Sequence, residues 1–295
     1  MQKVQKEFNR ILNQSDMNRF NDWREYRNAL TNHLLTIISN FNKSVNIIII
    51  GNGNCDDIDL KRLNEKANKL VLTDIDDLAL KSAIEKYQLE SVDIIPMDYL
   101  GFEDNELWNM FLTNIIKLET NQYKDYLNKM FQQKKPSPLT KHINAYDYVI
   151  VSPIYTQLLL PVFLQQLSFL KDINFEEKNL NYLKELFLKH LSKIIIEFNQ
   201  NIFNLGNNNS YYTIISDVLE AEINSDFHNK ADIAFNDNQM DILLDEYREK
   251  YGYGIGDYGL ENAKDFGNEI NNFWLKWSFS SKRVLYVKIS DYTKK

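Results

Sequence analysis

The sequence predicts an α/β protein in which the strands of a mostly parallel sheet alternate with helices. The first observation is a set of short, β-branched apolar runs, each suited to a strand buried on both faces: 45–50, 69–74, 92–98, 146–152 and 211–218. The second is that helical patterns separate these runs, as in right-handed βαβ units. The third is a pair of alternating runs, 273–279 and 284–289, which a short polar turn joins into a hairpin. One strand of this hairpin must therefore run antiparallel to its neighbour.

The first 43 residues are expected to form a helical extension in front of the sheet. Between positions 20 and 37, apolar and aromatic residues recur at spacings of three and four, which is the pattern of one helix face. Residues 44–295 are expected to form one domain. We interpret three long segments of this domain as insertions: 99–145, 167–210 and 219–272. The pattern within 156–199 predicts two helices that separate near 172–176.

The segment YGYGIGDYGL, at 251–260, is rich in glycine and tyrosine. A mobile aromatic lid over an active site has this composition. An ordinary ordered loop is the alternative.

Charge and hydropathy limit the partners of the chain. The 295 residues carry a formal net charge of -7, with 44% hydrophobic and 25% charged residues. Proteins that grip nucleic acid normally present a basic face, so the acidic total argues against nucleic acid. The N-terminal segment lacks the apolar core of a secretory signal, and no apolar run approaches the roughly 18 residues of a membrane span. We therefore expect a soluble, cytoplasmic protein that contacts no membrane; a homodimer is compatible with these data.

Cysteine and histidine usage argues against a metal centre. Cys55 is the single cysteine, which excludes an intramolecular disulfide and a cysteine-rich zinc site. The four histidines stand far from one another and from Cys55, without the spacing of metal ligands. No metal is expected.

A glycine turn follows the first predicted strand, in IIIIGNGNCDD. Gly51 and Gly53 lie where the strand should turn toward its helix, and glycine there permits positive φ and close approach of a ligand. A turn without a ligand is the alternative. The dinucleotide fingerprint GxGxxG fails, because Asp56 takes the place of its third glycine. Since a pyrophosphate would be repelled by Asp56 and Asp57, this turn suits a ligand with positive charge and no phosphate.

Acidic residues end the next two predicted strands. Asp74, at the end of the second strand, is placed to accept hydrogen bonds from both hydroxyls of a ribose. Asp76 or Asp77 can cap the helix that follows. Asp98, after the third strand, can accept from an adenine amine, and a plain turn or helix cap is the simpler interpretation.

In this order, these features resemble those of the class I S-adenosylmethionine (SAM) dependent methyltransferases. The resemblance covers roughly residues 44–289 and implies a Rossmann-like seven-stranded sheet of order 3-2-1-4-5-7-6, with SAM as cofactor. It implies that Gly51 and Gly53 lie beside the methionine part of SAM. It also implies that Asp74 binds the ribose and that Ile75, Met97 and Asp98 contact the adenine. One departure is that the family's GxGxG loop has Cys55 at its third glycine.

The end of the fourth predicted strand faces the transferred methyl group in this family. The residues Ser152-Pro153-Ile154-Tyr155 are similar to the Asn/Asp/Ser-Pro-Pro-Tyr signature of members that methylate amide or base nitrogens, although Ile154 replaces the second proline. Ser152 would then contact both cofactor and acceptor, and Tyr155 would stack on the acceptor. The alternatives are that Tyr155 simply begins a helix, or that it lines a small-molecule pocket with Ser152 and Gln157.

The predicted function is methyl transfer from SAM to a small-molecule acceptor. The candidate catalytic residues are Ser152, Tyr155 and Asp217, the last at the predicted end of the fifth strand. Three alternatives remain: methylation of an amide or base through the Ser152–Tyr155 motif, a non-catalytic module that binds SAM or a nucleotide, and an NAD-dependent enzyme.

Overall fold

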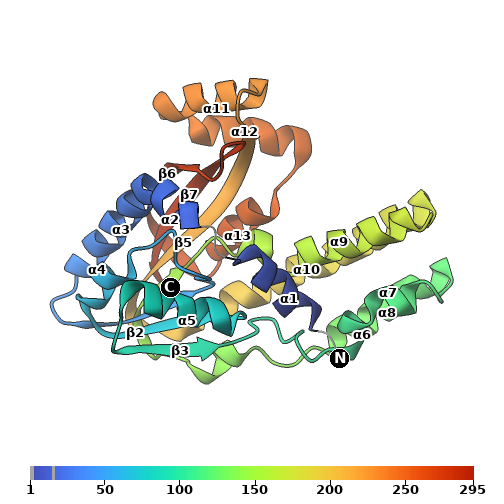
Figure 1. Ribbon diagram of the computed structural model, residues 1–295, viewed down its shortest axis with the longest axis horizontal. Helices are drawn as coiled ribbons and strands as arrows, with labels where there is room; N and C mark the ends of the chain where they lie inside the picture. Colours follow the sequence, from blue (N-terminus) through green and yellow to red (C-terminus); the bar gives the residue numbers. More distant parts are fainter. Residues whose placement is uncertain (1–2, 15–16) are drawn as a thin grey trace.

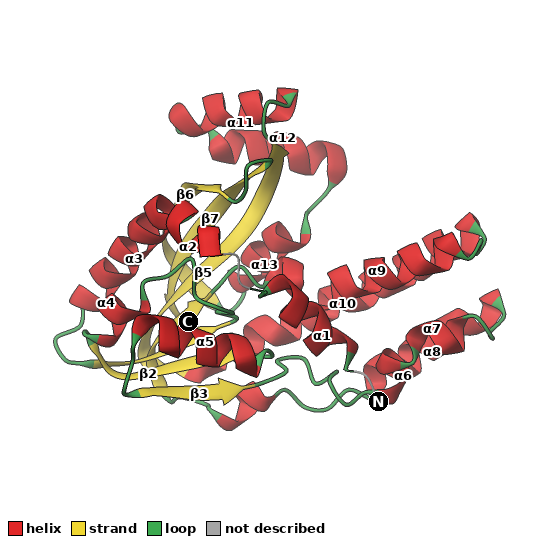
Figure 2. Ribbon diagram, in the orientation of Figure 1, coloured by secondary structure: helices red, strands yellow, loops and turns green. Residues whose placement is uncertain are grey.

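The computed structural model describes residues 3–14 and 17–295, and its centre is one seven-stranded sheet of order β3-β2-β1-β4-β5-β7-β6 (Figure 2). The strands are β1 (Val45–Ile50), β2 (Ala67–Asp74), β3 (Val92–Pro96), β4 (Tyr146–Val151), β5 (Gly206–Glu222), β6 (Gly267–Ser278) and β7 (Arg283–Lys294). The first five strands pair in parallel, whereas β7 runs antiparallel to both β5 and β6. The predicted fold class, strand order and terminal hairpin are therefore confirmed.

Helices cover both faces of the sheet (Figure 1). In chain order they are α1 (Val4–Leu12), α2 (Met17–Asp22), α3 (Arg24–Ser39), α4 (Leu60–Asn64), α5 (Asp77–Tyr87), α6 (Glu106–Asn109), α7 (Phe111–Ile115), α8 (Tyr123–Gln132), α9 (Leu159–Asp172), α10 (Glu177–Leu205), α11 (Asp226–Asn236), α12 (Met240–Tyr251) and α13 (Ile255–Ala263). Among these described helices, none has the combination of length and apolarity needed to cross a bilayer.

The continuous isoleucine run of β1 forms two cores at once. Because successive side chains of a strand point to opposite faces, Ile47 and Ile49 join the cluster beneath α3, α4 and α5. Ile48 and Ile50 join the larger cluster beneath α6 to α10 and α13. All four side chains are fully buried. This is why an unbroken apolar run is needed here rather than an alternating one.

Several helices of the segments that we interpret as insertions project from this frame (Figure 1). Helices α9 and α10 make a long pair that extends away from the sheet, with α6, α7 and α8 beside it (Figure 1). The two helices predicted within 156–199, with a break near 172–176, are confirmed, since α9 ends at Asp172 and α10 begins at Glu177. Helices α11 and α12 pack against the far ends of β5 and β7. The boundary of an N-terminal extension at residue 43 stays a prediction.

Some predicted boundaries were wrong. The third strand ends at Pro96 rather than 98, and Met97 and Asp98 lie in the turn that follows it. Proline has no N–H to donate, so it favours the end of a strand's pairing. The fifth strand continues to Glu222, because it pairs with β7 far beyond the point where β4 ends. Asp217 therefore lies within β5 and does not end it.

The lid interpretation of 251–260 was also wrong. Residues from Ile255 onward form helix α13, which packs into the larger core. Two glycines permit this close approach: a Cβ on Gly259 would lie 2.6 Å from the Tyr155 ring, and one on Gly256 would lie 2.8 Å from the Asp217 carbonyl oxygen. The Asp257 carboxylate is buried and receives two hydrogen bonds from Arg248, at 2.6 and 2.8 Å.

Candidate functional site

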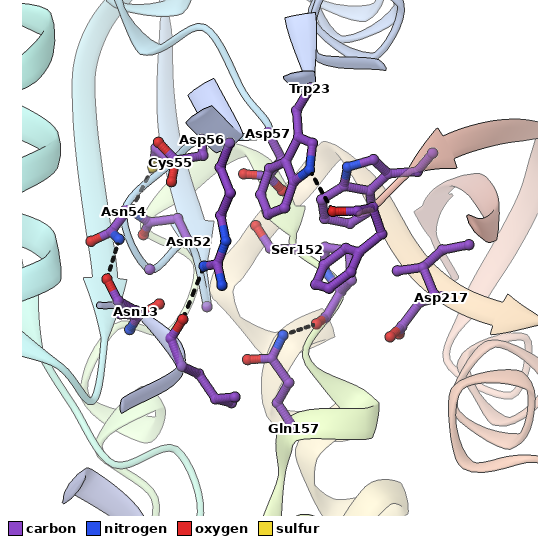
Figure 3. Close-up of a pocket in the computed structure, with 18 of the residues that line it drawn as sticks. Asn13, Trp23, Asn52, Asn54, Cys55, Asp56, Asp57, Ser152, Gln157 and Asp217 are labelled. Carbon is purple, nitrogen blue, oxygen red and sulfur yellow. Dashed lines mark hydrogen bonds between the residues drawn. The ribbon is translucent and has the colours of Figure 1, made fainter. Parts of the chain in front are cut away.

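A cavity of about 290 Å³ opens at the carboxyl ends of the central strands; we call it the main cavity. Its walls come from the turn 51–57 after β1, from Asp74 at the end of β2, from Ser152 after β4, and from Asp217 on β5. The β6–β7 hairpin and the segment around α2 complete it. Figure 3 shows the turn residues on one side of this cavity and Asp217 on the opposite side, with Ser152 between them. In open α/β sheets this edge is the usual place for a ligand.

The glycine turn has the backbone geometry that the sequence predicts. Gly51 and Gly53 both have positive φ, at 73° and 45°. The Gly51 amide donates to the hydroxyl of Tyr99 at 2.7 Å, and a Cβ on Gly51 would lie 2.6 Å from the side chain of Ile154. The turn therefore requires glycine at position 51 for both conformation and space.

Asp74 ties this turn to the end of β2. Its Oδ2 accepts the Gly53 amide at 2.9 Å, and its Oδ1 accepts the Asp76 amide at 2.9 Å. The residue is only 7% exposed, and burial raises the pKa of its carboxyl to about 6 although these amides oppose the shift. The expected helix cap is Asp76, whose Oδ1 accepts the Leu78 amide at 3.1 Å.

Cys55 occupies the position of the third glycine in a left-handed conformation, with φ of 51°. Such a φ is uncommon for a residue with a Cβ. The side chain is buried, and the side-chain amide of Asn52 donates to its Sγ at 2.8 Å. Burial, followed by the nearby charge of Asp57, raises the pKa of the Cys55 thiol well above its ordinary value. The thiol therefore stays protonated and packs as a small apolar group.

Ser152 and Asp217 both line the main cavity. Ser152 is 2% exposed, and its Oγ has no hydrogen-bond partner among the described residues. Asp217 is half-buried, and the Thr156 hydroxyl lies 3.0 and 2.8 Å from its two carboxylate oxygens. Burial raises the pKa of the Asp217 carboxyl to about 7.

Tyr155 is not brought to the cavity. It is fully buried beneath the sheet, where its hydroxyl donates to Asn199 Oδ1 at 2.6 Å. Its ring packs edge-on against Phe198, 5.9 Å between centroids. The strand β4 ends at Val151 and the 3₁₀ turn Tyr155–Gln157 begins here, which agrees with the alternative that Tyr155 begins a helical turn.

The three predicted adenine-side residues are outside the lining of the main cavity. Ile75 and Asp98 line a small cavity of about 30 Å³ that shares Gly51 and Asp74 with the main cavity, and with Met97 they line a further cavity of about 280 Å³. The Asp98 carboxylate accepts the amides of Leu100, at 3.0 Å, and Glu103, as expected of a turn cap. These contacts are compatible with the simpler interpretation of Asp98.

Helix α1 closes the small cavity. The side-chain amide of Gln5 donates to the backbone carbonyl oxygens of Gln157 and Leu158, both at 3.2 Å. Asn9 also lines this cavity, and both α1 side chains are at least nine-tenths buried. At the end of α1, the Asn13 amide donates to Asp76 Oδ2 at 3.1 Å. The predicted adenine position is therefore covered by α1 in this conformation.

Sequence reasoning missed a cluster of three aromatic side chains on one side of the main cavity. They are Trp23, Trp277 and Phe279, and we call them the aromatic wall. Trp23 lies 4.6 Å from Trp277 and 5.2 Å from Phe279 between ring centroids, and its Nε1 donates to the Phe279 carbonyl at 3.0 Å. All three line the main cavity. The alternating run 273–279 signalled a strand, but not the contact of that strand with α3.

Asp57 also lies at the cavity, although the sequence pattern predicts no role of its own for it in binding or catalysis. It lines the main cavity, is 8% exposed, and burial raises the pKa of its carboxyl to about 6. Its neighbour Asp56 differs, because Lys86 pairs with it at 2.5 Å. Within 3–14 and 17–295, no group of His, Cys, Asp and Glu side chains has the arrangement of a metal site.

Comparison with known proteins finds structural neighbours at low identity. No family model and no curated protein sequence matches this chain. N-methyltransferase NodS from Bradyrhizobium japonicum WM9, in complex with S-adenosyl-L-homocysteine (SAH), is 9% identical with a TM-score of 0.47, and the match covers 98% of each chain. A SAM-dependent methyltransferase from Aquifex aeolicus is 10% identical with a TM-score of 0.41, covering 90% of this chain and 89% of that chain. The chain is structurally similar to SAM-dependent methyltransferases, and at this identity the similarity concerns the fold alone.

Proposed function

We propose that the protein is a SAM-dependent methyltransferase that acts on a small-molecule acceptor. The observation that carries the proposal is the hydrogen bond from the Gly53 amide to Asp74 at the edge of the main cavity. It joins a positive-φ glycine turn after β1 to a buried carboxylate at the end of β2, in a sheet whose order is the one the family resemblance implies. These are the two places where the resemblance puts the methionine part and the ribose of SAM.

The residues present fit this cofactor on the methionine and ribose side. A carboxylate has about four lone-pair sites, and the two amides on Asp74 leave acceptor capacity for ribose hydroxyls. Gly51 and Gly53 line the cavity and carry no side chain of their own, although the side chains of Ile154 and Asn13 approach them closely. The buried Ser152 hydroxyl is available as a hydrogen-bonding partner. On the adenine side, Ile75, Met97 and Asp98 would hold the ring only after α1 moves.

The chain's contribution to the reaction is positioning and proton removal. SAM, when bound, supplies a methyl group on a positively charged sulfur. The aromatic wall keeps water from the acceptor side of the cavity, and Ser152 orients a polar group beside it. Asp217 is placed to accept a proton from the acceptor. Holding reactants in line is worth several kcal/mol, so no strong base is required.

The amide- or base-methylating alternative receives less support. Ser152 lines the cavity, but Tyr155 lies outside its lining and is held by Asn199. Its ring is therefore not available for stacking on an acceptor in this conformation. We retain a non-catalytic SAM-binding module as the competitor.

Calorimetric titration with SAM, SAH and NAD tests the proposal, first on the wild type and then on Asp74→Ala. We expect micromolar binding of SAM or SAH, loss of that binding in the variant, and no binding of NAD. Asp93→Asn is the matched control, because Asp93 is an exposed acidic residue on the neighbouring strand β3 and is paired with Lys69. A folded wild-type protein that binds neither SAM nor SAH would refute the proposal. SAM binding with no methyl transfer to any acceptor would favour the non-catalytic module.

A further inference from the structure

We propose that the acceptor is an aliphatic amine, bound as its cation between Asp57, Asp217 and the aromatic wall. This inference rests on the proposed function and names the substrate class of the same cavity. Three independent observations support it: unpaired buried carboxylates, aromatic faces and unsatisfied polar atoms.

Acidic side chains outnumber basic ones in the lining of the cavity, and some of these carboxylates have no counter-ion. Five acidic residues line it, namely Asp56, Asp57, Asp74, Asp217 and Glu220, against two arginines, Arg19 and Arg283. The outer charges are compensated, because Lys86 pairs with Asp56 at 2.5 Å and Arg283 pairs with Glu220 at 3.1 Å. Among the described ion pairs, none includes Asp57, Asp74 or Asp217.

In our proposal, two of these three carboxylates, Asp57 and Asp217, remain for the acceptor. Asp74 is already occupied by backbone amides and belongs to the ribose side of our proposal. Asp57 and Asp217 both line the cavity; in Figure 3, Asp57 lies near Trp23 and Ser152, and Asp217 lies at the right. Burying a carboxylate without a partner costs free energy, so a bound cation would relieve both positions. An anionic acceptor would add to the repulsion.

The arginines do not cancel this preference. The Arg19 guanidinium donates to the Leu12 carbonyl oxygen at 3.0 Å and lies 5.6 Å from the centre of the Trp23 ring. It is thus anchored on α1 at the cavity rim. Arg283 is exposed and also lies over Phe279, 5.1 Å from the ring centre. The cations that act on Asp57 are Lys86 and the buried Arg27, which oppose the rise in its carboxyl pKa, but neither forms an ion pair with it among the described residues.

The aromatic wall suits a cation that carries apolar carbon. Indole and phenyl faces attract ammonium groups, and the same rings pack against an alkyl chain. Trp277 is held in place by Tyr26, which stacks on it with 4.4 Å between ring centroids. A fixed wall loses little entropy when the acceptor binds.

Unsatisfied polar atoms indicate that the site is built for a ligand. Ser152 Oγ and Trp277 Nε1 are buried without partners among the described residues, in side chains that are 2% and 5% exposed and line the cavity. Leaving such atoms unpaired costs free energy, which a polar ligand or bound water would recover. The Ser152 hydroxyl can accept an N–H of the amine, and it is this atom that supports a cation. Trp277 Nε1 can only donate and an ammonium has no acceptor, so its partner would be a water molecule.

The chemical step balances with these groups. The bound ammonium gives one proton to the Asp217 carboxylate and becomes a neutral amine. Its freed lone pair forms the new nitrogen–carbon bond to the methyl group, while the carbon–sulfur bond breaks and its electron pair stays on sulfur. The product is the methylated ammonium, and Asp217 passes its proton to water. With a carboxyl pKa of about 7, Asp217 is suited to this exchange near neutral pH.

The test is calorimetric titration of the SAH-saturated protein with three probes of equal chain length: hexylamine, hexanol and hexanoate. We expect hexylamine to bind at least tenfold more tightly than either of the others. In Asp217→Asn and in Asp57→Asn, hexylamine affinity is expected to fall at least tenfold while SAH affinity stays within twofold. Glu222→Gln is the matched control, because Glu222 is an exposed acid on β5 outside the cavity lining. A transfer assay with labelled SAM should then show methylation of hexylamine and none of hexanol.

The possible failures are distinguishable. If SAH binds but the three probes bind alike, or if both variants keep the wild-type preference, the amine inference is overturned and the proposed function stands. If SAH does not bind to the folded protein, both fail. Two variants on different elements are used so that misfolding of one, seen by circular dichroism, leaves the other to decide.

Discussion

The backbone amide of Gly53 donates a hydrogen bond of 2.9 Å to Oδ2 of Asp74. Gly53 follows β1 and Asp74 is the last residue of β2, and this bond is one of the contacts that hold the glycine turn at the edge of the main cavity. Because the other oxygen of Asp74 accepts the Asp76 amide, one carboxylate organises both the turn after β1 and the start of α5. Asp74 therefore affects the shape of the site as well as its chemistry.

Asp74→Asn is expected to weaken SAH binding at least tenfold, or about 1.4 kcal/mol. An amide has one acceptor oxygen, and its NH₂ group would face the N–H of Gly53 or Asp76. In the wild type, SAH affinity should also fall as the pH drops through about 6, because a protonated Asp74 loses acceptor capacity. Calorimetry between pH 5 and 8 checks both effects. A flat pH profile together with an unaffected variant would remove Asp74 from the binding site.

The buried carboxylates are expected to make stability depend on pH. The pKa values of Asp57, Asp74 and Asp217 are raised from 3.8 to about 6, 6 and 7, so the folded state holds these protons more tightly than the unfolded chain. Their contribution to the free energy of unfolding is therefore fully present below about pH 4 and is lost as the pH rises through 6 to 7.

Asp217→Asn isolates one of these contributions. The amide that this change introduces would keep an acceptor for Thr156 but carry no charge. We expect the melting temperature of the variant to exceed that of the wild type by roughly 2–4 °C at pH 8 and to match it near pH 4. Thermal melts across this range, with Asp93→Asn as an exposed control, measure the difference. A constant difference at every pH would contradict the explanation.

Cys55 is expected to be unreactive in the native protein. Its side chain is 1% exposed, and burial raises the pKa of the thiol. A chromogenic disulfide reagent at pH 8 should label it at least about tenfold more slowly in buffer than in denaturant, since the thiolate is the reactive species. Rapid stoichiometric labelling without denaturant would mean that the turn opens readily.

Gln5→Ala tests whether α1 competes with the cofactor. If the adenine lies beside Ile75 and Asp98, shortening Gln5 removes a side chain that fills this space and two hydrogen bonds that hold α1. SAH affinity should then rise several-fold, because less binding energy is spent on displacing the helix. Ile11→Ala is the control on the same helix, since Ile11 is 62% exposed. An equal change in both variants would point to a general loosening of α1.

Tyr155→Phe is expected to affect stability and not binding. The hydroxyl donates to Asn199, whose amide also bonds to the carbonyl of Gly259 and to Asn262. Removing it leaves one buried acceptor without its donor, at a cost of about 1–2 kcal/mol. Denaturant titration should show this loss with SAH affinity and turnover per folded molecule unchanged. A large drop in turnover would place Tyr155 at the acceptor after all. Tyr182→Phe, on an exposed part of α10, is the control.

Local chemistry explains which features could be predicted. The β-branched run 45–50 is the strand β1 as predicted, because burial on both faces demands an unbroken apolar run. The glycines at 51 and 53 adopt the positive φ for which their lack of a Cβ suits them. The position of Asp74 at the end of β2 follows from the same reasoning. These properties depend on neighbouring residues and on the common edge of a parallel sheet, so the sequence by itself determined them.

The tertiary structure alone decided what surrounds that edge. Trp23 meets Phe279 across 256 positions of sequence, and no local pattern encodes such a contact. The same holds for α1, which covers Ile75 and Asp98 although its own pattern predicts only a helix. Tyr155 turned inward because a space beside Gly259 and Asn199 was open to its ring. Close packing between distant segments, rather than periodicity within one of them, determines which polar and aromatic side chains reach the cavity.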